Sequence, residues 1–292
     1  MFKGAITAIV TPFKENGDLD LEALKDLVEF QIVNGIDGIV PCGTTGESPS
    51  LSEEEHFEVV KTVIDAANGK VPVIAGAGSN STEHAIRLTK KAAELGADAA
   101  LHVCPYYNKP TQEGLYRHFS AIAKKVDLPL IVYNIQGRTA VNMETSTLAK
   151  LAREYSNIVG VKEASGNVAQ MMDVLNELPK SFTVLSGDDN LTFPLIALGG
   201  KGVISVAGNI IPKEMHQLTE LALNDDFEGA RKMHYQLLPL FKGIFIETNP
   251  IPIKAALAIK GFIKETYRLP LCEMKSENKE KLLQILKNLK IV

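Results

Sequence analysis

The sequence contains no tryptophan and only three cysteines among its 292 residues. Cys42, Cys104 and Cys272 are far apart and show no CxxC spacing, which argues against a disulfide framework and against a cysteine-ligated zinc site. The six histidines form no HxH, HxxxH or HExxH pair. We therefore expect no catalytic metal, and unpaired cysteines favour a reducing compartment, the cytoplasm.

Long hydrophobic runs and blocks of like charge are also missing. The apolar N-terminal stretch is interrupted by Pro12 and followed by Lys14 and Glu15, which is too short for a membrane span. Lys and Arg number 31 against 35 Asp and Glu, a net charge of −4, which argues against nucleic acid or a membrane as partner. No GxGxxG follows the first expected strand and no P-loop pattern occurs, so we expect no nucleotide cofactor.

The composition that remains is that of an ordinary globular protein, with 45% hydrophobic and 23% charged residues. Short β-branched runs alternate with longer stretches of helical period, and a run with its helix and loops recurs eight times. This alternation predicts a parallel sheet, and eight such units favour a closed (β/α)8 TIM barrel over an open doubly wound sheet. The expected strands lie at 6–10, 35–41, 71–76, 97–103, 128–134, 157–163, 182–187 and 201–206.

The helices have recognisable starts, and only helices are expected near the C-terminus. Ser52 with Glu55 predicts a capping box, and Asn80 with Glu83 repeats the pattern. After residue 206 no further strand is expected, but helical patterns cover 212–224, 226–242, 252–264 and 276–290. We therefore divide the chain into a catalytic barrel, 1–206, and a C-terminal helical extension, 207–292, packed on it because no flexible linker precedes it.

Lys162 is the most informative single residue, because reactive groups of such barrels lie where the strands end. It follows the apolar run Ile158–Val161, and period-two alternation places it on the face of Ile158 and Gly160. On a lumenal face the buried amine would have a lowered pKa and be available as a Schiff-base nucleophile. Alternatively, Lys162 simply ends the strand in solvent, and its position alone leaves both interpretations open.

Other strand ends carry polar groups with a similar ambiguity. Gly43-Thr44-Thr45-Gly46 offers backbone N–H groups and hydroxyls for a carboxylate, or is a simple connection. Tyr133 is a candidate proton carrier or a half-buried aromatic residue, and Tyr106-Tyr107 lies on a proline-bracketed loop suited to a subunit contact. Arg138 suits a carboxylate or a surface ion pair.

Taken together, these segments resemble the dihydrodipicolinate synthase family of Schiff-base-forming pyruvate aldolases and lyases. The resemblance spans the chain and rests on motifs in matching order. The motifs are Gly43-Thr44-Thr45-Gly46-Glu47-Ser48, Pro105-Tyr106-Tyr107-Asn108-Lys109-Pro110, Tyr133-Asn134, Arg138-Thr139, Gly160-Val161-Lys162-Glu163, Ser186-Gly187-Asp188-Asp189, Gly202-Val203-Ile204-Ser205-Val206 and Glu247-Thr248-Asn249-Pro250-Ile251-Pro252-Ile253-Lys254.

The resemblance implies a lyase that condenses pyruvate with aspartate-4-semialdehyde in the diaminopimelate route to lysine, through an imine on Lys162. It assigns proton transfer to Tyr133, linked by Thr44 to a Tyr107 contributed by a neighbouring subunit of a homotetramer. It also implies that Thr45 and Ile204 contact pyruvate, and that the semialdehyde site includes Arg138 and Gly187. The sequence departs from the family pattern at Gln136, where proline is usual, and at Ala140, where glycine is common.

The family also suggests a cleft for the effector lysine. Its matching residues here are Ser48, Pro49, Glu53, His56, Asn80, His84 and Tyr106. In the lysine-sensitive pattern a histidine stands in place of Glu53 and a glutamate in place of His84. We expect Glu53 to serve the helix N-terminus, and an imidazole is a poor partner for an ammonium group, so we predict weak or absent inhibition by lysine.

Two other functions remain as alternatives. An N-acetylneuraminate lyase or a 2-keto-3-deoxy-sugar-acid aldolase would share Lys162 and Tyr133, but Arg138 favours a short substrate with a carboxylate. A non-catalytic barrel that binds a ligand and signals to a partner would form no imine with pyruvate.

Overall fold

The computed structural model describes residues 2–292, and its centre is an eight-stranded parallel barrel. The strand order is β2-β1-β8-β7-β6-β5-β4-β3, and the bridge between Ile39 and Val73 joins β2 to β3. The predicted TIM barrel is therefore confirmed, with each strand at or within a few residues of its expected place. The strands are β1 (Gly4–Ala8), β2 (Gly38–Val40), β3 (Ile74–Gly76), β4 (Ala99–Val103), β5 (Leu130–Asn134), β6 (Ile158–Glu163), β7 (Thr183–Ser186) and β8 (Gly202–Ser205).

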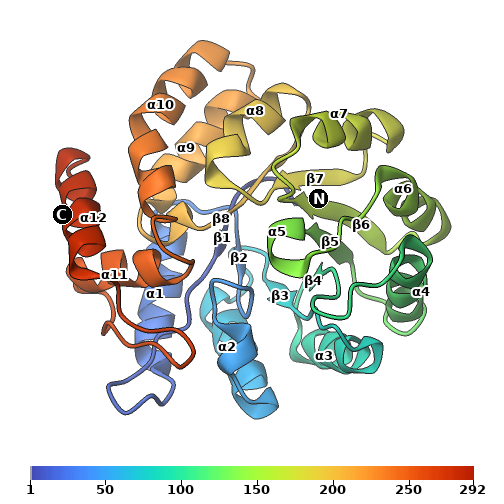
Figure 1. The fold of residues 1–292 in the computed structure, drawn as a ribbon, viewed down its shortest axis with the longest axis horizontal. Helices are drawn as coiled ribbons and strands as arrows, with labels where there is room; N and C mark the ends of the chain where they lie inside the picture. The colour runs from blue at the N-terminus through green and yellow to red at the C-terminus, as the bar shows by residue number, and fades with distance from the viewer. Residues whose placement is uncertain (1) are drawn as a thin grey trace.

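Eight helices surround the strands, and short helical elements lie in the loops that follow β2, β5, β7 and β8 (Figure 1). The surrounding helices are α1 (Leu21–Val33), α2 (Glu53–Ala67), α3 (Thr82–Leu95), α4 (Gln112–Ala123), α6 (Thr145–Glu154), α7 (Val168–Glu177), α8 (Thr192–Ala197) and α9 (Pro212–Leu223). The short elements are α5 (Gln136–Thr139), η1 (Ser48–Ser50), η2 (Asp189–Leu191) and η3 (Ala207–Asn209).

The C-terminal part is helical, as predicted. It continues through α10 (Phe227–Gly243), α11 (Ile251–Ile259) and α12 (Ser276–Asn288), and α12 packs on both other helices (Figure 1). Helix α9 packs against β1 and β8 and takes the place of the eighth barrel helix. The division at residue 206 stays an interpretation, and it cuts the eighth unit between its strand and its helix.

Two apolar layers hold the barrel together. Alternate strand residues fill the lumen, including Ile6, Ile74, Ile131 and Leu185, whereas the other strand faces pack against the helices. Within residues 2–292 no helix is both long enough and apolar enough to cross a membrane.

The alternation predicted for β6 is wrong at its first residue. Ile158 packs in the outer layer rather than on the lumenal face of Lys162, and Val159 packs against the lumen. The cause is a register irregularity, because adjacent Leu130 and Ile131 of β5 pair with Ile158 and Gly160. Beyond it the pairing is regular, and Lys162 lies opposite Tyr133.

One of the two predicted helix starts is correct. Ser52 and Glu55 form a complete capping box at the start of α2. At α3 the N-cap is Ser81 rather than Asn80, and its hydroxyl accepts a hydrogen bond from the His84 N–H. The prediction was off by one residue because Asn and Ser are both good N-caps and stand side by side.

Candidate active site

The amine of Lys162 lies over the aromatic ring of Tyr133 inside the mouth of the barrel. The Lys162 Nζ is 4.2 Å from the centroid of the Tyr133 ring, and each residue is 6% exposed. The neighbouring lumenal residues are apolar, so the amine has little water around it. The lumenal alternative for Lys162 is the one that the structure adopts.

Burial shifts the pKa of both groups in directions that suit carbonyl chemistry. Desolvation lowers the pKa of Lys162 to about 8, although nearby Asp189 and Asp188 oppose this effect. Desolvation also raises the pKa of Tyr133 to about 12, so the phenol stays protonated at neutral pH. The site thus pairs a partly neutral amine with a proton donor.

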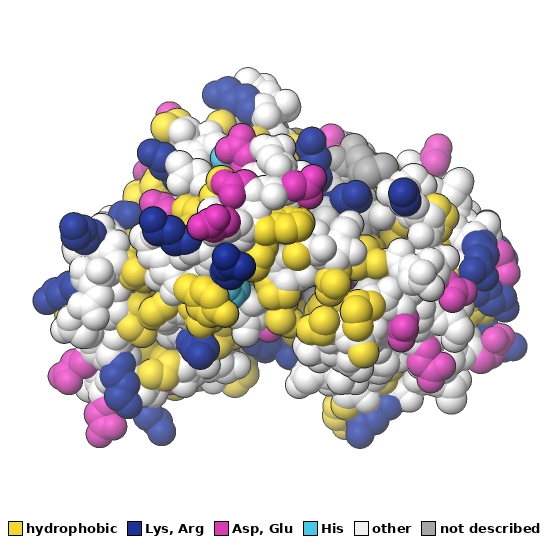
Figure 2. Space-filling view, turned by 90° about the horizontal axis from the view of Figure 1, so that it is seen from above, with side chains coloured by type: hydrophobic (Ala, Val, Ile, Leu, Met, Phe, Trp, Pro, Cys, Tyr) yellow, Lys and Arg dark blue, Asp and Glu magenta, His cyan; other side chains and the backbone are white. Residues whose placement is uncertain are grey.

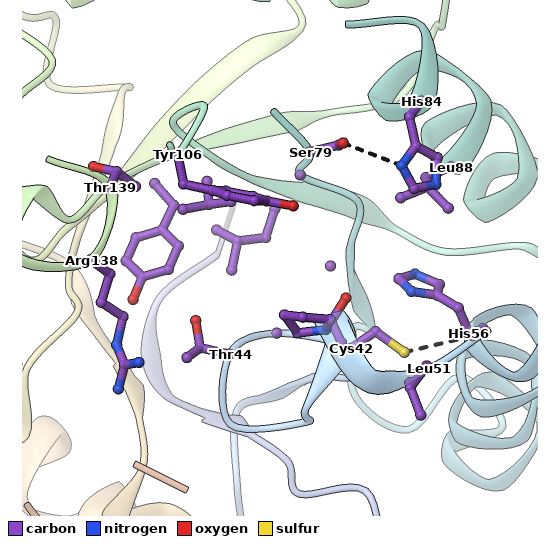
Figure 3. Close-up of a pocket in the computed structure, with 18 of the residues that line it drawn as sticks. Cys42, Thr44, Leu51, His56, Ser79, His84, Leu88, Tyr106, Arg138 and Thr139 are labelled. Carbon is purple, nitrogen blue, oxygen red and sulfur yellow. Dashed lines mark hydrogen bonds between the residues drawn. The ribbon is translucent and has the colours of Figure 1, made fainter. Parts of the chain in front are cut away.

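A cavity of about 510 Å³ is lined in part by Tyr133 and is shown in Figure 3. Lys162 contacts the ring of Tyr133 but is not itself one of the residues that line this cavity. Thr44, from the loop after β2, lines it on the same side as Arg138, and its hydroxyl opposes the rise in the pKa of Tyr133 that burial causes. The structure therefore brings Thr44, Tyr133 and Arg138 together, as predicted, although they come from different loops and strands.

Arg138 lies on the short helix α5, above the end of β5. Its Nη2 donates a hydrogen bond to the backbone oxygen of Asn249, at 3.1 Å, and its positive charge lowers the pKa of Lys162. An anionic substrate group bound by Arg138 would therefore lie near the amine.

Three further predicted residues also lie around the site. Gly187 is pressed against Lys162, because a Cβ atom there would lie 3.0 Å from the lysine Cε. Ile204 is fully buried in the lumen, and Thr45 is 2% exposed and accepts a hydrogen bond of 3.0 Å from the Asn249 side chain. A Cβ atom at position 187 would also lie only 2.5 Å from the Ala164 Cβ, so any side chain larger than glycine would force both neighbours to shift.

Tyr107 is not part of the cavity of its own chain. It is 89% exposed, on a loop where its φ is +72°, and it does not line the cavity that Thr44 and Tyr133 line. Its neighbour Tyr106 lines the cavity (Figure 3). A catalytic role for Tyr107 stays a prediction that requires a second subunit.

The outer end of the cavity contains most of the predicted effector residues. Ser48, Pro49, Glu53, His56, His84 and Tyr106 line it, and Asn80 does not. The backbone oxygen of Asn80 instead accepts a hydrogen bond from the Asn108 side chain.

Glu53 is already paired at this outer end. Arg87 donates three hydrogen bonds to it from Nε and Nη2, the shortest of 2.7 Å, and the His84 Nε2 lies 3.3 Å from the same carboxylate. These contacts lower the pKa of Glu53. Glu53 lies in the first turn of α2, where we expect it to serve the helix N-terminus, but it also binds Arg87, a contact that no local sequence pattern indicates.

The C-terminal part is also linked to the loop after β2, which no sequence pattern predicts. Lys254 and Glu47 form an ion pair of 2.5 Å with both side chains almost fully buried. Asn249 contacts both Thr45 and Arg138. The motifs contain these residues, but nothing local in the sequence indicates pairing across 111 to 207 positions.

The chain matches the model of the dihydrodipicolinate synthetase family over residues 1–289. The 4-hydroxy-tetrahydrodipicolinate synthase of Methanocaldococcus jannaschii is 54% identical over 292 residues, all of both chains. The crystal structure of dihydrodipicolinate synthase from Aquifex aeolicus is 52% identical and covers 99% of each chain, with a TM-score of 0.98.

A further similar structure contains lysine. It is the dihydrodipicolinate synthase of Cyanidioschyzon merolae, 44% identical, with a TM-score of 0.97 and covering 100% of this chain and 99% of its own. A match of this extent in sequence and fold establishes that the chain belongs to the dihydrodipicolinate synthetase family.

Proposed function

We propose that this chain is a 4-hydroxy-tetrahydrodipicolinate synthase, a lyase that condenses pyruvate with aspartate-4-semialdehyde in lysine biosynthesis through an imine on Lys162. The observation that carries the mechanism is the buried amine of Lys162 beside the Tyr133 phenol. We assign the catalytic roles to Lys162, Tyr133, Thr44 and Tyr107.

The reaction begins at the amine. Neutral Lys162 attacks the C2 carbonyl of pyruvate, and the carbonyl oxygen leaves as water after proton transfers, which gives the imine. The protonated Tyr133 phenol donates to the departing oxygen and later takes a proton back, with Thr44 as its hydrogen-bonding neighbour. Thr45 and Ile204 border the pyruvate.

Condensation follows when the imine loses a proton from C3 and becomes an enamine. Its C3 forms a bond to the aldehyde carbon, and the aldehyde oxygen takes up a proton. The amino group from the semialdehyde then attacks C2, which releases Lys162 and closes the ring. Arg138 binds the semialdehyde carboxylate and Gly187 leaves the space beside the amine.

Turnover with alternative substrates tests this assignment. Pyruvate should be consumed only when aspartate-4-semialdehyde is present, and cleavage of N-acetylneuraminate or a 2-keto-3-deoxy-sugar acid should be much slower. Faster turnover of either sugar acid would show that the chain is one of the related aldolases. These reactions need no metal or organic cofactor in our scheme.

We also propose a homotetramer. On the face that carries α7, α8 and α10, hydrophobic side chains form a band between charged ones (Figure 2). The exposed large apolar residues of these elements include Met172, Leu198, Phe227 and Tyr235. Such a band supports burial against a second copy, and exposed Tyr107 supports a second contact near the active site.

The free cysteines support a cytoplasmic location.

The outer cavity gives a further proposal, that lysine inhibits this enzyme weakly or not at all. The C. merolae structure holds lysine. In this chain the one carboxylate of the cleft, Glu53, already binds Arg87, and His84 adds no negative charge for an ammonium group. Titration of the activity with lysine at subsaturating pyruvate tests this proposal. Strong inhibition at lysine concentrations below about 1 mM, the range expected for a working effector site, would contradict it.

A further inference from the structure

Asn249 contacts groups that the proposed function assigns to both substrates. It lies between α10 and α11 and is 5% exposed. Its Nδ2 donates a hydrogen bond of 3.0 Å to the Thr45 Oγ1, and its backbone oxygen accepts from the Arg138 Nη2 at 3.1 Å. A residue outside the barrel strands thus lies between the pyruvate side and the semialdehyde side.

The direction of the hydrogen bond to Thr45 matters for chemistry. An amide nitrogen only donates, so the Thr45 oxygen is the acceptor and its own proton is not used in this contact. Within residues 2–292 this hydroxyl makes no other side-chain hydrogen bond. A carboxylate only accepts, so the remaining proton has the polarity needed to bind the carboxylate of pyruvate.

A second contact holds the loop that carries Thr45 close to the segment that carries Asn249. Lys254, on α11, forms its buried ion pair with Glu47, two residues after Thr45 in the same loop. The Asn249 Nδ2 makes the contact with Thr45, whereas the Oδ1 is buried and has no hydrogen-bond partner within residues 2–292. The loop after β2 is therefore attached to the C-terminal segment through both Thr45 and Glu47.

We propose that Asn249 is a positioning residue that sets the Thr45 hydroxyl as a hydrogen-bond donor to the pyruvate carboxylate. This rests on the proposed function, because it takes pyruvate as the compound bound near Lys162. Asn249 itself does not touch the reacting atoms and acts through Thr45.

Asn249→Asp tests this by reversing the polarity at nearly constant shape. A carboxylate at this position accepts the Thr45 proton and withdraws it from pyruvate. We expect the KM for pyruvate to rise by about tenfold or more, the effect of losing a hydrogen bond to a charged group. The KM for aspartate-4-semialdehyde should change far less, since the backbone oxygen that binds Arg138 remains.

Three further variants make the outcome decisive. Thr45→Val should raise the KM for pyruvate to a similar extent, and the double variant should be no worse than either single one. Asn249→Ala should have a smaller effect, because the hydroxyl is then free to turn either way. The matched control is Asn224→Asp at an exposed site, which should leave both KM values unchanged.

An unchanged KM for pyruvate in Asn249→Asp, or an equal rise for both substrates, would overturn the proposal. If Asn249→Asp does not fold, the same comparison of the KM for pyruvate with the KM for aspartate-4-semialdehyde is made on Asn249→Ala. The pyruvate concentration that half-saturates imine trapping gives the same information without turnover. Failure of the wild-type enzyme to form an imine would instead overturn the proposed function.

Discussion

At the scale of single residues, the buried Lys162 is costly to the fold. Its pKa of about 8 lies below the 10.5 of a free lysine, so between these values the unfolded chain binds more protons than the folded one. Stability therefore rises with pH through this window, and below pH 8 the folded protein carries the whole cost of burying the charge. Activity is the reason to keep such a residue.

We predict that Lys162→Met abolishes turnover and stabilises the protein at pH 7. The gain should be about 3 kcal/mol, from the size of the pKa shift, because methionine fills similar space without a charge. It should shrink toward zero above about pH 10. Melting curves of both proteins from pH 6 to 10 measure it, and a gain that grows with pH would refute the assignment.

Arg138→Ala should affect the second substrate more than the first. Loss of a bidentate carboxylate contact should weaken transition-state binding by roughly 2 to 5 kcal/mol, which lowers kcat/KM for aspartate-4-semialdehyde. Imine formation with pyruvate should persist, but its pH midpoint should move upward, since the guanidinium lowers the pKa of Lys162. Arg153→Ala, at an exposed ion pair, is the matched control. A downward shift of the midpoint would contradict this account.

At the scale of elements, local patterns predicted the strands because the residues on one strand face, lumenal or outer, recur at every second position. They failed at Ile158, where one extra residue in β6 changes the phase, and such an irregularity depends on the pairing with β5. They also missed the contact of Lys254 with Glu47, because the residues are 207 positions apart and only the folded chain brings them together.

We predict that this ion pair fixes the loop after β2 to α11. Lys254→Met leaves the Glu47 charge buried without a partner and should cost about 3 to 5 kcal/mol, a fall in melting temperature of roughly 10 °C. The double variant Glu47→Gln, Lys254→Met should recover much of this loss, because no charge remains buried. A double variant that melts below the single one would show that the pair does not act in this way.

At the scale of the whole molecule, the fold was predictable from the sequence and the complete site was not. Eight repeated units specify a barrel, whereas the position of Tyr107 depends on a loop with a positive φ and on contacts that one chain does not contain. The resemblance alone suggested that it belongs to a neighbour's site. Its exposure of 89% agrees with that suggestion and leaves it to be tested.

Mixing two inactive variants tests the sharing of sites between subunits. Tyr107→Phe should form the imine but lose most turnover, and Lys162→Met should lose both. Mixed assemblies contain sites with Lys162 from one chain and Tyr107 from the other, so activity should return to at most about a quarter of the wild-type level. No recovery in verified mixed assemblies, or full activity of Tyr107→Phe, would contradict the shared site.

The central claim, that Lys162 forms the imine, is tested most directly by trapping with borohydride in the presence of pyruvate and mapping the adduct by peptide mass spectrometry. The account predicts one pyruvate-derived adduct per chain, on Lys162, that forms faster as the pH rises toward and past 8. An adduct on any other lysine, or none at all, would contradict it.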